Sequence, residues 1–163
     1  MEKYFIFLRT IRDCCWYYHQ LIKHRFFIFY YTVKICCKLL YRSLIHDFEK
    51  FSIKEFIILK DVIPLGRKMR KVKYGTIEHK ELMGKIRAIK DTHYFNSPHH
   101  PEFYKNGFSD MGFLDRVEMI VDWKAATKRN LNGDIKMSIE NSQEKYQYGD
   151  EDKEWMLKIA ENL

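Results

Sequence analysis

The stretch from about residue 21 to residue 42 constrains the fold most, because its apolar residues recur at steps of three and four. That spacing is typical of an amphipathic helix that buries one face, and it predicts a helix here. The predicted buried stripe consists of His24, Phe27, Ile28, Tyr31, Ile35 and Leu39. An imidazole therefore lies on a face that is expected to pack against the rest of the chain.

Helical patterns also account for most of the remaining sequence. One segment carries His46 and Asp47. Another starts at Ser52, where Ser52–Glu55 form a capping box, and ends at Pro64 and Gly66. Further helices are predicted at residues 2–20, 76–94, 111–128, 134–147 and 150–162. Thr76 is the expected cap of the 76–94 helix. With 163 residues, three Pro and seven Gly, the chain is expected to be all-α: a single-domain bundle of about six to eight helices. Its core would span about residues 20–130, and the helices of 134–162 would pack on that core.

Charge and cysteine content narrow the class of protein. The net charge of +7 favours anionic partners such as nucleotides. The longest apolar run, residues 26–33, is far too short to cross a membrane, and no signal peptide is evident. The adjacent pairs Cys14–Cys15 and Cys36–Cys37 fit no zinc spacing, so a reduced, cytoplasmic protein is expected.

Candidate metal ligands recur along the chain. His46 and Asp47 are adjacent, and imidazole and carboxylate together suit divalent metals. His99 and His100 lie in a loop between two prolines, which cannot be helical throughout. His93 and Asp122 lie on helix faces that are predicted to turn inward. Each of these residues alone is more often a core or surface residue than a ligand, so the hypothesis depends on their coincidence in one small chain.

Together these residues resemble the H…HD…D signature of the HD-domain superfamily of metal-dependent phosphohydrolases. From about Ile22 to Trp155 the chain also resembles an uncharacterised bacterial and phage family, the domain-of-unknown-function family numbered 5662. The segments that carry the resemblance are residues 23–24, 44–52, 93–102 and 118–126. The superfamily resemblance implies an HD-type helical bundle, and it implies chemistry only by analogy.

The resemblance also implies a ligand set. His24, His46, Asp47 and Asp122 would hold one metal, and Asp47 would bridge to a second ion held by His93 and by His99 or His100. His93 and His99 are only six residues apart, closer than the corresponding ligands usually lie. The sequence therefore leaves open whether the site holds one ion or two. His79 is an alternative ligand for the second ion. The expected cofactor is one or two divalent ions of Mn, Fe, Zn, Co, Ni or Mg.

Other residues are candidates for the chemistry. Lys50 could reach a substrate phosphate as a point charge, or it could be a solvated lysine at a helix end. Glu118, one helical turn before Asp122, could orient a ligand or protonate a leaving group. Residues 50–90 are strongly basic and could attract a nucleotide, although such a run is usually a solvated face. The predicted substrate-binding residues are Lys50, Asn96, Arg67 and Lys71.

The leading hypothesis is a metal-dependent phosphohydrolase, a phosphomonoesterase or phosphodiesterase, that acts on a nucleotide or other phosphorylated small molecule. One alternative is a di-iron oxygenase on the HD scaffold, because His46–Lys50 fits the HD-x-x-K spacing of such members. Another is a non-catalytic nucleotide-binding module of viral origin. Nucleic acid is a less favoured partner, and the expected location is the cytoplasm of a bacterium or of an infected host cell.

Overall fold

Helices make up all the regular structure of the described chain. The computed structural model describes residues 2–89 and 91–163, which form seven α-helices and three short 3-10 helices without a strand. The predicted all-α class and the predicted number of helices are confirmed. The chain divides into two compact units, Met1–Leu44 and Ile45–Leu163, which are described separately.

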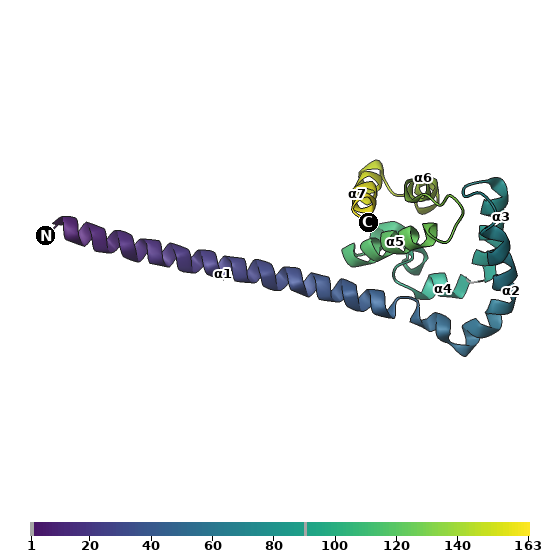
Figure 1. Ribbon diagram of the computed structural model, residues 1–163, viewed down its shortest axis with the longest axis horizontal. Coiled ribbons are helices and arrows are strands. Elements are labelled where there is room, and N and C mark those ends of the chain that lie inside the picture. Colours follow the sequence, from purple (N-terminus) through teal and green to yellow (C-terminus); the bar gives the residue numbers. More distant parts are fainter. Residues whose placement is uncertain (1, 90) are drawn as a thin grey trace. The chain divides into compact units, whose positions relative to one another are not determined.

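The first unit is the long helix α1 (Glu2–Ile45), drawn in purple and blue in Figure 1. The sequence predicted two helices here, and that division is wrong, because these residues include no Pro or Gly that would end a helix. The predicted burial of its apolar stripe is also wrong. Phe27 is 43% exposed and Tyr31 is 57% exposed. Periodicity correctly predicts the helix, but it does not predict what covers a face.

Within residues 2–89 and 91–163, no helix combines the length and the apolar character that a membrane span requires.

The second unit begins with the packed helix pair α2 (Ile53–Met69) and α3 (Ile77–Ile89). Helix α2 starts directly after Ser52, as predicted, but the side chain of Glu55, the other half of the capping box, lies outside the described residues. Pro64 lies inside α2 rather than at its end, so the predicted end at Pro64 and Gly66 is wrong. The Thr76 hydroxyl accepts a hydrogen bond from the His79 amide at 3.3 Å, which confirms the predicted cap of α3.

Three further helices enclose the core of this unit: α5 (Phe113–Thr127), α6 (Ile135–Tyr146) and α7 (Asp150–Glu161). Figure 1 shows α6 and α7, in green and yellow, against α5. Their fully buried contacts include Met119 and Ile120 of α5, Ile139 of α6 and Met156 of α7. This packing fixes the orientation of α5, whose other face carries Glu118 and Asp122.

Short elements complete the second unit. The 3-10 helix η1 (Phe48–Phe51) follows α1, and the six-residue helix α4 (Asp91–Asn96) follows α3. The 3-10 helices η2 (Pro101–Phe103) and η3 (Gly107–Asp110) connect α4 to α5. These short elements and the turns beside them contain His46, His93, His99 and His100.

Candidate metal centre and adjoining pocket

His46 and Asp47 lie in the turn between α1 and η1. The backbone of Asp47 has φ 58° and ψ 20°, which places it in the left-handed region. Aspartate enters that region more readily than most residues because its short polar side chain can bond locally. In this turn, His46 Nε2 lies 3.3 Å from Asp47 Oδ2. The adjacent pair therefore forms one potential metal-binding unit.

Asp122 of α5 joins this pair. Its Oδ1 is 3.5 Å from His46 Nε2, and one ligand atom from each of the three residues lies within 4.8 Å of the others. We call His46, Asp47 and Asp122 the mixed group. The sequence prediction that these residues come together is consistent with this geometry.

Three histidines form a second cluster, the histidine group: His93 of α4, with His99 and His100 of the following loop. A turn brings them together, because the His100 amide donates a hydrogen bond to the Ser97 carbonyl across Pro98 at 2.9 Å. All three residues are buried, and their ligand atoms also lie within 4.8 Å of one another. The short spacing between His93 and His99 thus does not separate them, and both loop histidines can take part.

Asp47 faces both groups with different oxygens. Its Oδ2 faces His46. Its Oδ1 lies 3.2 Å from His93 Nε2 and 3.5 Å from His99 Nε2. A carboxylate in this position can bridge two metal ions.

Hydrogen bonds set the tautomer of His46. Its Nδ1 is 2.9 Å from Glu118 Oε1, and since a carboxylate accepts, Nδ1 carries the hydrogen. Nε2 then faces the oxygens of Asp47 and Asp122, and it carries a proton while the ring is charged and a lone pair when the ring is neutral. Acceptors that face acceptors repel unless a proton or a cation lies between them.

His93 is held in the same way. Its Nδ1 lies 2.8 Å from Glu49 Oε1, which also accepts a hydrogen bond from the Ser97 hydroxyl at 2.9 Å. Its Nε2 consequently faces Asp47 Oδ1 and His100 Nε2, the latter at 3.1 Å. Carboxylates that orient the outer nitrogen of a histidine are characteristic of metal sites. The sequence did not indicate Glu49, which is half-exposed and lies within a 3-10 helix.

Electrostatics differ between the groups. The carboxylates of Asp122, Asp47 and Glu118 raise the pKa of His46 to about 11. Burial, with its neighbours His99 and His93, lowers the pKa of His100 to about 3, so this ring is neutral at pH 7. Burial alone would raise the pKa of Asp47, but contacts with His46, His93, His99 and Lys50 lower it, so the carboxylate is charged.

The residues present fit a divalent metal. His46 Nε2, Asp47 Oδ1 and His99 Nε2 are buried without a hydrogen bond of ordinary geometry. Unpaired buried polar atoms are unusual, and here three of them converge on one place. Imidazole with carboxylate suits Zn, Mn, Fe, Co or Ni better than Mg, which prefers oxygen ligands alone.

Lys50 lies against the mixed group. Its ammonium forms an ion pair with Asp47 Oδ2, and its side chain lines a pocket beside the donors. The structure therefore places this predicted residue at the candidate centre, where a substrate phosphate could also reach it.

Other predicted residues lie elsewhere. His24 belongs to the first unit, where it is exposed on α1, and its role as a ligand stays a prediction. Asn96, Arg67 and Lys71 are exposed and do not line the pocket, whereas Arg70 does. His79 also lines the pocket, but it belongs to none of the clustered donor groups among the described residues.

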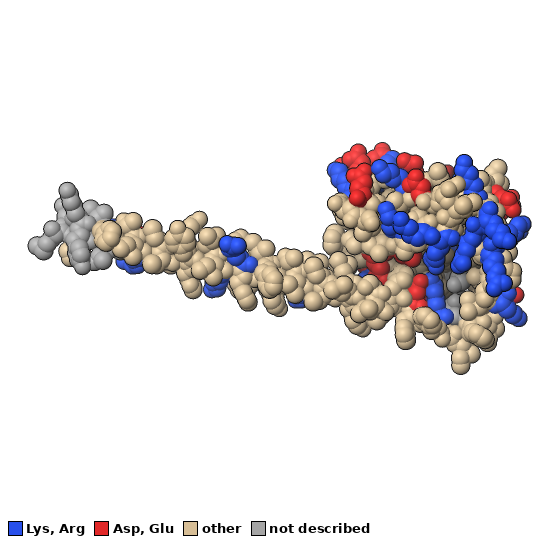
Figure 2. Space-filling view, viewed as in Figure 1, with Lys and Arg blue, Asp and Glu red and all other residues tan. Residues whose placement is uncertain are grey.

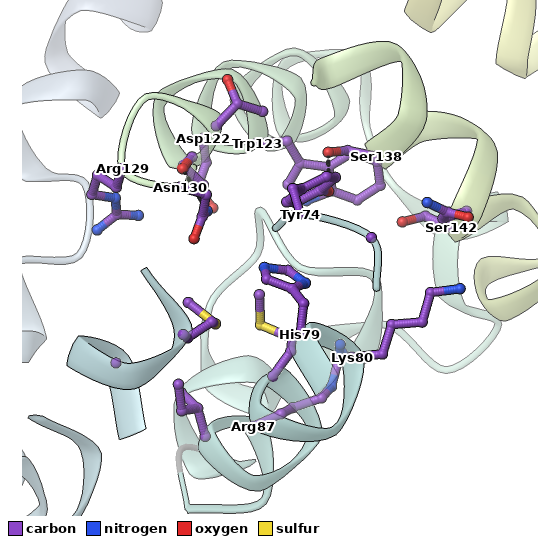
Figure 3. Close-up of a pocket in the computed structure, with 18 of the residues that line it drawn as sticks. Tyr74, His79, Lys80, Arg87, Asp122, Trp123, Arg129, Asn130, Ser138 and Ser142 are labelled. Carbon is purple, nitrogen blue, oxygen red and sulfur yellow. Dashed lines mark hydrogen bonds between the residues drawn. The ribbon is translucent and has the colours of Figure 1, made fainter. Parts of the chain in front are cut away.

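A pocket of about 570 Å³ adjoins the donors, with walls from α2, α3, α5 and α6. Its lining includes His93, His100 and Asp122 from the donor groups. Six Lys or Arg side chains line it against a single acidic one, Asp122; the six are Lys50, Arg70, Lys80, Arg87, Arg129 and Lys145. Figure 2 shows Lys and Arg gathered on the side of the second unit that carries α2 and α3, and Figure 3 shows several of the lining side chains. This charge balance suits an anionic ligand.

Two of these cations are fixed in place. Arg87 pairs with Glu102 and lies over the ring of Tyr94, 4.5 Å from its centroid. Lys145 donates to Glu102 Oε1 at 3.1 Å and to the Tyr146 hydroxyl at 3.0 Å. Since two cations share one carboxylate, the cluster has an excess of positive charge. No sequence pattern links Arg87 with Lys145, because they lie on helices far apart in the chain.

Comparison with known proteins identifies a family but no function. No curated protein and no solved structure matches the chain at a significant level, so nothing in the comparisons supports the HD-domain resemblance. The model of a family of unknown function, DUF5662, matches residues 15–163, which include both donor groups and the pocket. The chain belongs to this family of unknown function.

Proposed function

We propose that this protein is a metal-dependent phosphohydrolase of the HD-domain type, which acts on a nucleotide or another phosphorylated small molecule. The observation that carries the proposal is the position of Asp47. Its two oxygens face two separate donor groups, and buried nitrogen and oxygen atoms in both groups lack hydrogen-bond partners. That arrangement is the one a two-metal site needs.

The ligand residues would divide between two ions. His46 and Asp122 would hold one, His93, His99 and His100 the other, and Asp47 both. When bound, such ions supply positive charge at a phosphoryl oxygen and make a water molecule more acidic. Glu118 and Glu49 would keep the imidazoles oriented by accepting from His46 Nδ1 and His93 Nδ1.

Cations beside the donors would bind the phosphate. Lys50 contacts Asp47, and Arg87 lies over Tyr94, whose ring is 4.6 Å from that of His100. Positive charge in a partly desolvated pocket stabilises both the bound phosphate and the charge that develops on it during transfer. Arg87 can offer planar, paired donors, whereas Lys50 acts as a point charge.

Metal-dependent phosphate release tests the proposal. Purified protein would be stripped with a chelator, reloaded with Mn, Co, Ni, Zn or Mg, and assayed on nucleotides and on p-nitrophenyl phosphate. We expect turnover that depends on metal and is lost in Asp47→Asn. Asp61→Asn, a matched change at an exposed position of α2, should retain activity. If no metal restores phosphate release from any substrate, the proposal is wrong.

A di-iron oxygenase is the second candidate, and the contact between Lys50 and Asp47 favours it specifically. In the HD-type oxygenases that this segment resembles, the HD-x-x-K lysine holds the substrate; Lys50 has that spacing, and it contacts Asp47. Bound iron with a mixed-valent spectroscopic signal, together with oxygen consumption, would support this function. An active enzyme free of iron would exclude it. Ligand binding without turnover, insensitive to chelator, would instead indicate a non-catalytic nucleotide-binding module.

A further inference from the structure

A second polar cluster lies in the pocket wall, outside the donor groups. His79 of α3 is only 4% exposed, and its Nε2 has no hydrogen-bond partner. The side-chain oxygen of Asn130, another lining residue, is also buried without a partner. Figure 3 shows the His79 ring standing on α3, with Asn130 and Asp122 on the facing wall. Buried polar atoms of this kind usually have a partner, so their lack of one needs an explanation.

Both side chains are held in position by other contacts. Asn130 Nδ2 donates to the Ala126 carbonyl at 2.8 Å, so the amide is oriented with Oδ1 as the available acceptor. The His79 ring packs against that of Tyr74, with centroids 4.7 Å apart. The Tyr74 hydroxyl is itself hydrogen-bonded to the Ser138 hydroxyl. The cluster therefore has a fixed shape and does not depend on a ligand for its geometry.

His79 offers a neutral hydrogen-bonding group. Burial lowers its pKa, and an interaction with the Asn130 side chain opposes this only in part. A neutral imidazole nitrogen can donate or accept, while Asn130 Oδ1 only accepts. The cluster is therefore suited to an uncharged planar edge that carries both donors and acceptors, and it is poorly suited to another phosphate.

The rest of the pocket restricts the ligand further. Its six cations favour an anionic ligand, and His93, His100 and Asp122 of the donor groups line the same pocket. Trp123, Tyr94 and Tyr146 add aromatic surface to the walls. A volume of about 570 Å³ lies within the range for ligands of nucleotide size.

We propose that the pocket selects a nucleoside monophosphate, with the edge of its base bound by His79 Nε2 and Asn130 Oδ1 and its phosphate directed to the donor groups. This assignment rests on the proposed phosphohydrolase function and adds the substrate class to it. A sugar phosphate without a base would leave His79 and Asn130 with only each other as side-chain partners and would bind more weakly.

The test compares substrates that share a phosphate and differ in the base. The metal-loaded protein is assayed with the common nucleoside 5′-monophosphates and with ribose 5-phosphate. We expect kcat/KM for at least one nucleotide to exceed that for ribose 5-phosphate by about tenfold or more. In His79→Phe, which keeps the ring, and in Asn130→Leu, that ratio should fall to within about twofold. His19→Phe makes the first of these changes on the exposed surface of α1 and should leave the ratio unchanged.

The outcomes separate the two proposals. Equal kcat/KM for nucleotides and ribose 5-phosphate in the unaltered protein would overturn the substrate assignment and leave the hydrolase intact. If no phosphate is hydrolysed, titration calorimetry with the same ligands measures their binding instead and tests the pocket assignment. Nucleotide binding that is lost in His79→Phe would then support the pocket assignment while the proposed function fails. Should His79→Phe not fold, Asn130→Leu and the unaltered protein still decide the question.

Discussion

The mixed group and the histidine group share Asp47, but they differ in charge. Three carboxylates, those of Asp122, Asp47 and Glu118, raise the pKa of His46 to about 11. Burial and the neighbouring rings of His99 and His93 lower the pKa of His100 to about 3. The mixed group therefore contains two carboxylates beside a readily protonated imidazole, whereas His100 of the histidine group is neutral at pH 7. This difference predicts unequal metal sites, with the mixed group holding its ion by charge and the histidine group by imidazole lone pairs.

The largest effect is expected where the two groups meet. Asp47→Asn keeps the shape of the side chain but removes the charge that both groups use. We expect both ions to be lost and activity to fall on the order of 10³-fold. Metal analysis and phosphate release measure this, with Asp61→Asn as the control. A variant that still holds as much metal as the unaltered protein would show that Asp47 does not bridge.

Single-group variants should separate the two sites. Asp122→Asn removes a carboxylate from the mixed group only, and His100→Gln removes a ring from the histidine group only. We expect each to lower the metal content by about one ion, with the larger loss of activity in Asp122→Asn, where charge is removed. Metal titration of both variants checks this. Loss of all metal from both would mean that the groups form a single site.

A smaller effect is expected at Glu118, which orients His46. Glu118→Gln can still accept from His46 Nδ1, but it no longer supplies negative charge. Metal affinity should fall by about 10- to 100-fold. Competition with a metal-binding dye measures the affinity, and Glu140→Gln, at an exposed position of α6, is the control. An unchanged affinity would show that Glu118 does not act on the metal centre.

The smallest effect lies outside both groups, at Lys145. Burial, with Arg87 nearby, lowers its pKa from 10.5 to about 8, so its charge is present below pH 8 and is lost as the pH rises through 8. We expect KM for a phosphate substrate to increase by about threefold between pH 7 and pH 9, since anion binding needs the cation. Lys145→Arg stays charged and should flatten this dependence. If KM rises equally steeply with pH in Lys145→Arg, the pH dependence arises from the donor groups or from the substrate, not from Lys145.

The lowered pKa of Lys145 also makes the free energy of unfolding depend on pH. The unfolded chain binds a proton at this lysine up to pH 10.5, whereas the folded chain releases it near pH 8. The unfolded state therefore binds more protons in that window, and the contribution of Lys145 to the free energy of unfolding rises with pH.

The donor groups could be predicted from the sequence because their members lie in short local patterns. His46–Asp47 and His99–His100 are adjacent pairs, and Asp122 lies one helical turn after Glu118, the residue that orients His46. Thr76 likewise has a local capping signal that the structure confirms.

The cations that line the pocket could not be predicted in this way. Arg87 and Lys145 meet through Glu102, and neither their spacing nor their neighbours distinguishes them from solvated surface residues. Glu49 orients His93 only because the fold places the two side chains beside each other. The periodicity of the sequence does not predict that contact. The predicted burial of the apolar stripe on α1 is wrong for a related reason, because the sequence of a helix does not specify which surface covers it.

Metal content measured by mass spectrometry on the purified, full-length protein tests the two-group description most directly. We predict about two ions per chain in the unaltered protein, about one in Asp122→Asn and in His100→Gln, and none in Asp47→Asn. Anomalous scattering from crystals should place both ions within ligand distance of Asp47. Protein that binds no divalent metal at millimolar concentration, or binds it equally well without Asp47, would contradict the central claim.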